Sequence, residues 1–329
     1  MRDSTMANSI VEYTLSNQTN ESISIINYGA RLTSWITQID NEKCNIILSY
    51  PDLNDYLSDP YYLGAIAGPY ANRISNAQIH IDNKVCILDQ NEGSNQLHGG
   101  QKALSDLFWQ LDYHQKNALS LSITLPDGYN GYPGKTTFNV LYSFTTSNND
   151  QSKLDIKFTI TSNKKTIAGP TSHPYFNLNG SNNSAYGHVL KLAGAHYTPI
   201  NTHAIPSGLI LPVANTPFDY TSARVLNTTD KLDHNFLIEQ TLNLHTVKQH
   251  ATLKSADEKL ALNVLSNYPA IQVYTGHHLK NPFKAFDGIC LEPQFCPDSP
   301  NNPHFPFSYI TPQVPLQTHI SYCLTNFKS

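Results

Sequence analysis

Apolar and polar side chains alternate with a period of two along much of this chain. The alternation is strict at 119–125 (Leu-Ser-Leu-Ser-Ile-Thr-Leu) and at 154–160 (Leu-Asp-Ile-Lys-Phe-Thr-Ile). Because successive side chains of a strand point to opposite faces, this pattern predicts strands with one buried and one exposed face. Looser versions of the pattern predict further strands at 24–26, 32–36, 138–142 and 270–274.

Turn-forming residues separate these segments. Asp82, Asn83 and Lys84 lie between apolar segments at 79–81 and 85–87, which predicts a β-hairpin. A loop rich in Gly and Tyr is expected at 127–134, and short turns of helix are expected only at 53–57 and 103–107. Many short strands joined in this way favour an all-β fold, a large antiparallel β-sandwich with few short helices, formed as a single domain by residues 1–329.

Composition and charge narrow the class of protein. Hydrophobic residues make up 40% of the 329 residues and charged residues 14%, which is typical of a globular protein with a sizeable core. The formal net charge is -4 and Lys and Arg are not clustered, so neither nucleic acid nor an anionic membrane is expected as a partner. No apolar run approaches the roughly 18 residues that span a bilayer, and the first residues lack an apolar signal segment.

The cysteines indicate the compartment. Their number is odd, and they are scattered without the close spacing of a metal site. This usage predicts reduced thiols in a cytoplasmic protein. The five are Cys44, Cys86, Cys290, Cys296 and Cys323.

Three segments differ from ordinary sandwich sequence because each joins a titratable side chain to a rigid or tightly turning backbone. They lie at 71–74 together with 95–100, at 172–178, and at 291–301. Loops of this kind on a β-scaffold commonly carry binding and catalytic residues. Each also has an ordinary explanation: turn capping for His98, an ion pair for Arg73, and exposure before a proline for Glu292.

The fourteen histidines raise the question of a metal site. No two of them have the His-x-x-x-His spacing of a zinc-binding helix. The adjacent pair His277 and His278 would point to opposite faces of a strand. The sequence therefore predicts no metal site.

Seven short motifs follow one another in a fixed order between Ala71 and Asn301. The motifs are Ala-Asn-Arg-Ile, Leu-His-Gly-Gly, Gly-Tyr-Pro-Gly, His-x-Tyr-Phe-Asn-Leu, Asp-His-Asn-Phe, Gln-x-Tyr-Thr-Gly and Glu-x-Gln-x-x-Pro-Asp-Ser-Pro-Asn. In these motifs and in their order the chain resembles the aldose 1-epimerase (galactose mutarotase) family.

The resemblance implies a fold, an activity and a set of roles. It implies a galactose mutarotase-like supersandwich that binds a sugar in a cleft on one sheet and interconverts the α and β anomers of a free aldose such as glucose or galactose. No cofactor and no metal are implied. His173 is expected to be the general acid and Glu292 the general base. The residues expected to hold the sugar hydroxyls and ring oxygen are Asn72, Arg73, His98, Tyr175, Asp233 and Gln272.

These residue types suit the opening and reclosing of a pyranose ring. A base must take the proton of the C1 hydroxyl while an acid delivers one to the ring oxygen. An imidazolium and a carboxylate are expected to supply this pair near neutral pH. A glycosidase would instead use two carboxylates, one of them protonated, whereas the acid implied here is a histidine.

Two alternatives share the scaffold: a hexose-6-phosphate 1-epimerase, and a sugar-binding protein without catalysis. The first would need additional cations for the phosphate, and this chain has Pro69 where family members commonly carry an Arg. Other departures are Pro293 and Cys296, in place of the usual Thr and Phe, and His277-His278, in place of a Gly-Asn type pair. The departures bear on which sugar is preferred and leave both expected catalytic residues in place.

Overall fold

The computed structural model describes residues 9–19, 21–40, 42–147, 151–181 and 183–327. The first six residues, where no signal segment was expected, lie outside these ranges. Helices in the described ranges are short 3-10 segments, and none is long and apolar enough to cross a membrane. They are η1 (Leu53–Ser58), η2 (Ser75–Ala77), η3 (Leu104–Asp106), η4 (Tyr129–Gly131) and η5 (Ser299–Asn301). The helical turns expected at 53–57 and 103–107 are confirmed as η1 and η3.

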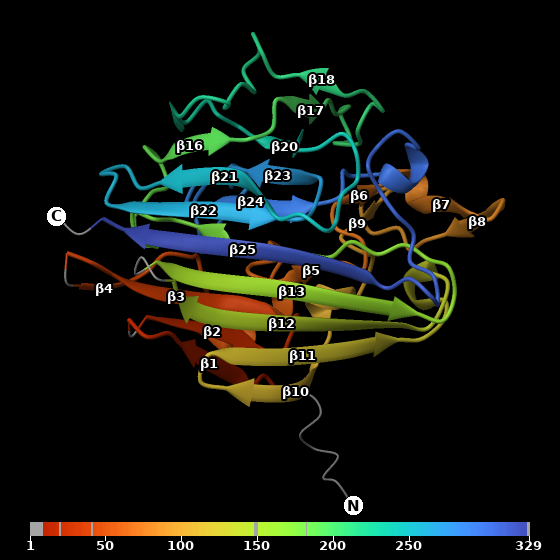
Figure 1. Cartoon of the computed structure of the whole chain (residues 1–329), viewed down its shortest axis with the longest axis horizontal. Helices are drawn as coiled ribbons and strands as arrows, with labels where there is room; N and C mark the ends of the chain where they lie inside the picture. The colour runs from red at the N-terminus through yellow and green to blue at the C-terminus, as the bar shows by residue number, and fades with distance from the viewer. Residues whose placement is uncertain (1–8, 20, 41, 148–150, 182, 328–329) are drawn as a thin grey trace, which may run out of the picture.

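A nine-stranded antiparallel sheet forms one layer of the molecule (Figure 1). The strictly alternating segments lie in its long strands, where every second side chain of 152–162 is buried. The strands predicted at 119–125, 138–142 and 154–160 are therefore confirmed. The order across the sheet is β10 (Gln110–Gln115), β11 (Ala118–Leu125), β12 (Thr136–Thr146), β13 (Ser152–Ser162), β25 (Leu316–Asn326), β22 (Leu260–Ser266), β21 (Lys248–Lys254), β16 (Val189–Leu192) and β19 (Arg224–Val225).

Two smaller sheets pack on this layer. The four-stranded sheet, in order, contains β1 (Glu12–Ser16), β2 (Ser22–Ile26), β3 (Arg31–Ile39) and β4 (Glu42–Asn45). The six-stranded sheet contains β15 (Tyr175–Phe176), β24 (Ile289–Gln294), β23 (Ala270–Tyr274), β20 (Asp233–Leu237), β17 (His196–Thr198) and β18 (Leu211–Pro212). The strands predicted at 24–26, 32–36 and 270–274 are thus also confirmed.

Three short ladders complete the fold. They are β5 (Ile66–Ala67) with β14 (Thr171–Ser172), β6 (Arg73–Ile74) with β9 (Gln96–Leu97), and β7 (Gln78–Ile81) with β8 (Lys84–Ile87). The last is the predicted hairpin. Its two turn residues, Asp82 and Asn83, both have positive φ, of 48° and 60°. Two successive positive φ values match the right-handed twist of the flanking strands, and Asp and Asn tolerate them well.

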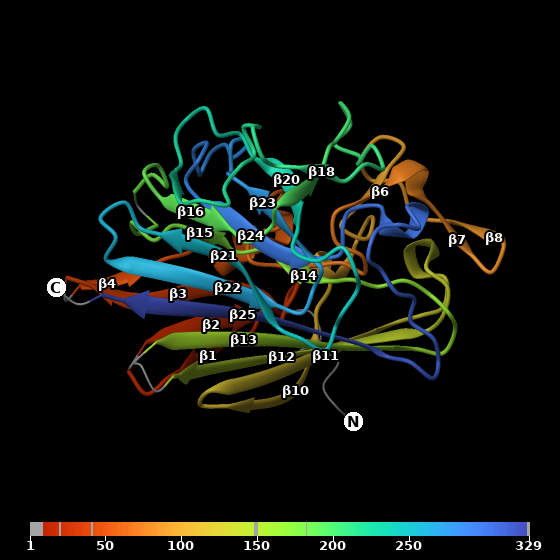
Figure 2. The same cartoon turned by 45° about the horizontal axis from the view of Figure 1, so that its top comes forward.

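Aromatic side chains join the layers into one core. Trp35 of β3 packs edge-on against Phe144 of β12, with ring centroids 5.5 Å apart. Phe176 of β15 lies 5.0 Å from Tyr322 of β25, and the Tyr322 hydroxyl donates to the carbonyl of Leu291 at 3.0 Å. Both smaller sheets therefore cover the same nine-stranded sheet, as Figure 2 shows. The predicted all-β sandwich is confirmed.

The six-stranded sheet has a second, polar face that points away from this core. In register across its central strands, Asn235 of β20 lies opposite Gln272 of β23, which lies opposite Glu292 of β24. All six residues of β24 are buried. Glu292 was expected in a loop at 291–301, and that expectation is wrong because a regular strand runs through Gln294. The alternation does not mark β24 because both of its faces are covered.

Candidate active site

An open pocket of about 270 Å³ lies on this polar face. This volume lies just below the roughly 300–1,000 Å³ of typical ligand pockets, which favours a small ligand such as a single sugar ring. All eight residues proposed from the sequence line it together. The lining is Pro60, Tyr61, Tyr62, Asn72, Arg73, Leu97, His98, His173, Tyr175, Asp233, Gln272, Tyr274, His278 and Glu292.

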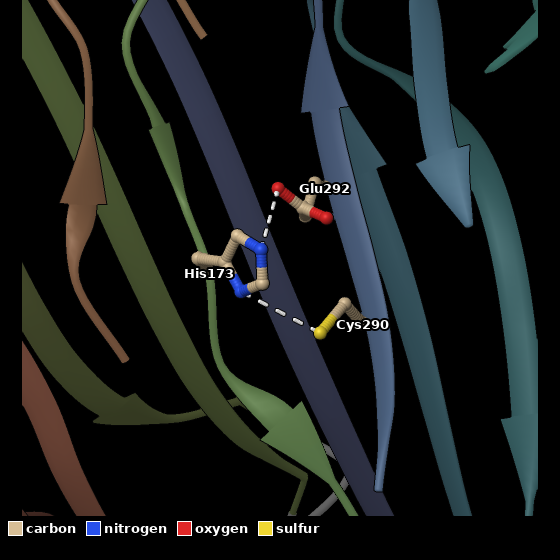
Figure 3. Close-up of side chains that lie close together, drawn as sticks. All are labelled: His173, Cys290 and Glu292. Atoms are coloured by element: carbon tan, nitrogen blue, oxygen red, sulfur yellow. Dashed lines mark hydrogen bonds and ion pairs between the residues drawn. The ribbon is translucent and has the colours of Figure 1, made fainter. Parts of the chain in front are cut away.

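His173 and Glu292 face each other at the pocket floor. His173 lies between β14 and β15, where its backbone N–H donates to Ala65 and its carbonyl accepts from Gly64, each at 2.9 Å. Its ring nitrogen Nε2 lies 3.6 Å from Glu292 Oε2 (Figure 3). Its Nδ1 lies 3.5 Å from Cys290 Sγ. The ring is thus held between two side chains of the same strand.

Burial changes the protonation expected of this pair. Burial lowers the pKa of His173 to about 4. Burial, and secondly the negative charge of Asp233, raises the pKa of Glu292 well above its ordinary value. Both shifts disfavour the charged forms, because a charge removed from water loses its hydration. The imidazolium expected near neutral pH is therefore wrong for the empty site, because a His173 pKa of about 4 leaves the ring neutral. The raised pKa of Glu292 favours the protonated carboxyl over the expected carboxylate.

A direct prediction concerns His173 in the unliganded protein. We expect its imidazole to be neutral at pH 7 and to gain a proton only near pH 4, since burial lowers its pKa to about 4. Loss of hydration disfavours the cation, so protonation moves to lower pH. Ring 15N chemical shifts followed over a pH titration measure this, with His173→Asn assigning the signal. A midpoint at or above the ordinary histidine value of about 6.5 would contradict it.

Asn72 and His98 support one another from the opposite wall. Both have a left-handed backbone, with φ of 64° and 49°. The Asn72 N–H donates to His98 Nδ1 at 3.1 Å, and the His98 N–H donates to the Asn72 carbonyl at 3.0 Å. Burial, followed by the nearby His173 and Arg73, lowers the pKa of His98 well below its usual range. His98 is therefore a neutral imidazole with its proton on Nε2, which makes that nitrogen a donor.

Arg73 and Gln272 are oriented by carboxylates. Glu92 accepts from Arg73 Nε at 2.7 Å and from Nη2 at 2.8 Å, a bidentate pair that fixes the guanidinium plane. Asp233 Oδ1 accepts from Gln272 Nε2 at 2.7 Å. Gln272 Oε1 and Glu292 Oε2 are buried without a hydrogen-bond partner among the described residues. Buried polar atoms of this kind normally have partners, so both are free to bind a polar ligand.

Comparison with known proteins places the chain in a family. The model of the aldose 1-epimerase family matches residues 11–323. The chain belongs to this family. It is 31% identical over 311 residues to aldose 1-epimerase of Escherichia coli (strain K12), covering 89% of this chain and 88% of that protein. It is 30% identical over 307 residues to galactose mutarotase of Mus musculus, covering 88% and 87%.

Solved structures agree with the fold. The aldose epimerase homologue from C. elegans matches with a TM-score of 0.89 and 24% identity, over 97% of this chain and 100% of that one. Galactose 1-epimerase from Lactobacillus acidophilus NCFM matches with a TM-score of 0.80 and 26% identity, over 97% and 99%. The galactose mutarotase-like sandwich expected for this aldose epimerase family member is confirmed.

Aromatic side chains form the remaining wall of this epimerase pocket. The ring of Tyr62 lies 4.5 Å from that of His98, and the ring of Tyr175 lies 5.1 Å from that of His173. Tyr175 donates its hydroxyl hydrogen bond to the carbonyl of Tyr61 at 3.0 Å. Aromatic faces pack well against the C–H faces of a sugar, while the polar groups opposite take its hydroxyls.

Two departures from the family pattern lie close to the pocket. His277 and His278 are in the turn after β23, with ring centroids 4.2 Å apart, so the expected opposite faces of a strand are wrong. His278 lines the rim and stacks on Tyr274 at 6.4 Å. Pro69 lies against Gly99, the residue after His98, because a Cβ on Gly99 would come within 2.4 Å of Pro69 Cδ. That close approach requires glycine at position 99.

Several residues that shape this site were missed in the sequence. Cys290 contacts His173. Cys290 lies two residues before Glu292, so a strand over these residues would have predicted that Cys290 and Glu292 share a face. Glu92 orients Arg73 from a loop and gave no such signal. Asp59 holds the wall at 60–63 by accepting from the Tyr61 and Leu63 N–H groups at 3.0 and 2.7 Å.

Proposed function

We propose that this aldose 1-epimerase opens the ring of a free aldose and recloses it on the other face, with His173 as acid and Glu292 as base. The observation that supports these roles is the facing pair itself: Nε2 and Oε2 lie 3.6 Å apart at the floor of a pocket sized for one sugar. A general acid and base must both reach the substrate within hydrogen-bond distance. Groups this close together can contact two neighbouring oxygen atoms, and the C1 hydroxyl and ring oxygen are bonded to the same carbon.

Ring opening moves two protons and breaks one bond. Glu292 takes the proton of the C1 hydroxyl as the C1–O5 bond breaks, and His173 delivers a proton to O5. The aldehyde then rotates about C1–C2 and the same groups act in reverse. The pair needs one proton in total, and the raised pKa of Glu292 favours keeping that proton on its carboxyl in the empty site. Hydrogen bonds from sugar hydroxyls to the Glu292 carboxylate favour its ionised form, so substrate binding moves that proton toward His173.

Neighbouring groups position the ring and stabilise charge. His98 Nε2–H and the Arg73 guanidinium are donors suited to negative charge that develops on the ring oxygen. Asp233 and the free Oε1 of Gln272 are acceptors for sugar hydroxyls, and Asn72 and Tyr175 complete the polar contacts. A polyol needs such mixed donors and acceptors around its ring.

Polarimetry tests the proposal. Freshly dissolved α-D-glucose and α-D-galactose should approach anomeric equilibrium faster with the protein than without it. A sugar-binding protein without catalysis would bind either sugar, as calorimetry would show, and leave the rate unchanged. That result would remove the catalytic roles of His173 and Glu292.

Phosphorylated sugars provide a second prediction. We expect hexose 6-phosphates to be poor substrates, because a phosphate brings nearly two negative charges and usually needs Arg forks or a helix N-terminus. Among the described lining residues Arg73 is the one Lys or Arg, and Glu92 already binds it. The test compares kcat/KM for glucose and glucose 6-phosphate. A tenfold preference for the phosphate, about 1.4 kcal/mol, would favour the 6-phosphate epimerase instead.

The proposal also includes the binding partners, the cellular compartment and the domain organisation. A small sugar is the partner expected, with no role for nucleic acid, membrane, cofactor or metal in the reaction. The five cysteines are free thiols, which supports a reducing compartment such as the cytoplasm. A single domain over residues 1–329 is supported by one main hydrophobic cluster that runs from Leu15 to Leu324.

A further inference from the structure

A third side chain completes a compact group with the acid and base. Cys290 and Glu292 lie two residues apart on β24 and share a face, and His173 lies between them (Figure 3). One ligand atom from each of the three lies within 4.8 Å of the others. All three side chains are buried, with 5%, 0% and 2% of their residues' surface exposed for His173, Cys290 and Glu292.

The spacing of these atoms resembles that of a metal site. Tetrahedral zinc, with Zn–S of about 2.3 Å and Zn–N of about 2.0–2.1 Å, holds its sulfur and nitrogen ligands about 3.5 Å apart. Cys290 Sγ lies 3.5 Å from His173 Nδ1. Glu292 Oε2 lies 3.6 Å from the other ring nitrogen, Nε2. A single ion would use one of the two nitrogens, so the carboxylate or the ring must turn to complete the site.

A separate observation is an open binding position on the carboxyl of Glu292. Glu292 Oε2 is buried without a hydrogen bond among the described residues. A buried oxygen left in this way costs free energy, which a bound cation would recover as a sugar hydroxyl would. Two members of the group, His173 and Glu292, line the pocket, so an ion can reach them from solvent and a water can occupy its fourth position.

We propose that His173, Cys290 and Glu292 bind a soft divalent cation such as Zn²⁺, and that the bound ion inhibits the enzyme. The thiol and imidazole select Zn²⁺ over Mg²⁺, which prefers oxygen ligands. The inhibitory part rests on the proposed function, because the ion occupies the acid and the base. Zinc and sugar then compete for one place, so zinc raises KM and leaves kcat unchanged.

Metal binding at this site releases protons and needs no oxidant or reductant. The Zn–S bond forms as the Cys290 thiol loses its proton to solvent, and the imidazole of His173 coordinates in its neutral form. The carboxyl of Glu292 releases its proton to solvent when its oxygen coordinates. No electron is transferred, and a chelator reverses each step.

Direct metal binding tests the site without reference to turnover. Metal-free protein is titrated with Zn²⁺ by calorimetry, and with Co²⁺ by absorption, where a thiolate-to-cobalt charge-transfer band reports the sulfur ligand. We expect one ion per chain, and no uptake of Mg²⁺. Polarimetric inhibition by Zn²⁺ should be competitive with glucose and reversed by EDTA.

Matched cysteine variants locate the ligand. Cys290→Ala should abolish the cobalt band and weaken zinc binding. Loss of a residue that only hydrogen-bonds to a metal ligand typically lowers affinity by roughly 10- to 100-fold, and the loss of a ligand itself should cost at least as much. Cys290→Ser keeps the volume and serves if the alanine variant unfolds. Cys296→Ala is the control, because Cys296 is equally buried, lies six residues further along the chain and is not one of the three ligands.

The outcomes separate the two proposals. Unchanged zinc affinity in both Cys290 variants, or no cobalt band in the wild type, would overturn the metal site. A wild type that binds Co²⁺ through a thiolate but does not accelerate anomer exchange would keep the site and remove the proposed function. Zinc binding by the wild type with no effect on its turnover would overturn the inhibitory role.

Discussion

Glu292→Gln is expected to lower kcat for anomer exchange by on the order of 10²–10⁴, the usual contribution of a general base, while KM changes little. The amide keeps the shape of the carboxyl and its place on β24, where Glu292 lies opposite Gln272. It cannot accept the C1 proton. Polarimetric rates with α-D-glucose give the measurement. Glu258→Gln, at an exposed position outside the pocket, is the matched control.

The same substitution should raise stability while it lowers activity. Burial raises the pKa of Glu292, so above the ordinary value of about 4.3 the unfolded chain ionises this group more readily than the folded protein. The carboxyl therefore costs stability at neutral pH, and the amide does not. Thermal unfolding at pH 7 should show a higher Tm for Glu292→Gln, with the gain shrinking toward pH 4. Near-wild-type kcat in this folded variant would exclude Glu292 as the base.

Periodicity in the sequence predicts the long strands because only one of their faces is covered. In β12 and β13 the outward residues keep partial exposure, so polar side chains alternate with apolar ones. The six residues of β24 have no exposed face, since the core covers one side and the pocket walls cover the other. A polar residue on this strand faces the binding site and not solvent. The alternation of polar and apolar residues in a sequence cannot distinguish these two cases.

The site could be predicted as a set of residues but not as an arrangement. The motifs named eight of the fourteen lining residues as site residues in advance, including Asp233 and Gln272 from separate strands. Their partners were harder to find, because Glu92 reaches Arg73 from a loop whose path is set by tertiary contacts. Protonation could not be predicted, because it depends on burial. The low pKa of His173 follows from its desolvation and not from its neighbours in the sequence.

The acid and the base act together in one concerted proton exchange on the substrate. The fold-losses in kcat caused by removing each group should therefore not multiply in the double variant. His173→Asn is expected to lower kcat by on the order of 10²–10⁴, as the loss of the base does. The double variant His173→Asn/Glu292→Gln should be little worse than either single variant. Once one group is missing, the concerted route is closed and the other has no proton transfer to assist. The 3.6 Å contact between Nε2 and Oε2 also couples the two side chains in the free protein.

A double-mutant cycle in kcat measures this coupling. The four proteins are assayed by polarimetry at one pH, with circular dichroism to confirm folding. His250→Asn controls for the loss of a buried imidazole, because His250 is fully buried in β21 and does not line the pocket. Its kcat should stay near that of the wild type. If the double variant instead loses the product of the two single losses, the groups act in separate steps, and a stepwise mechanism must replace the concerted one.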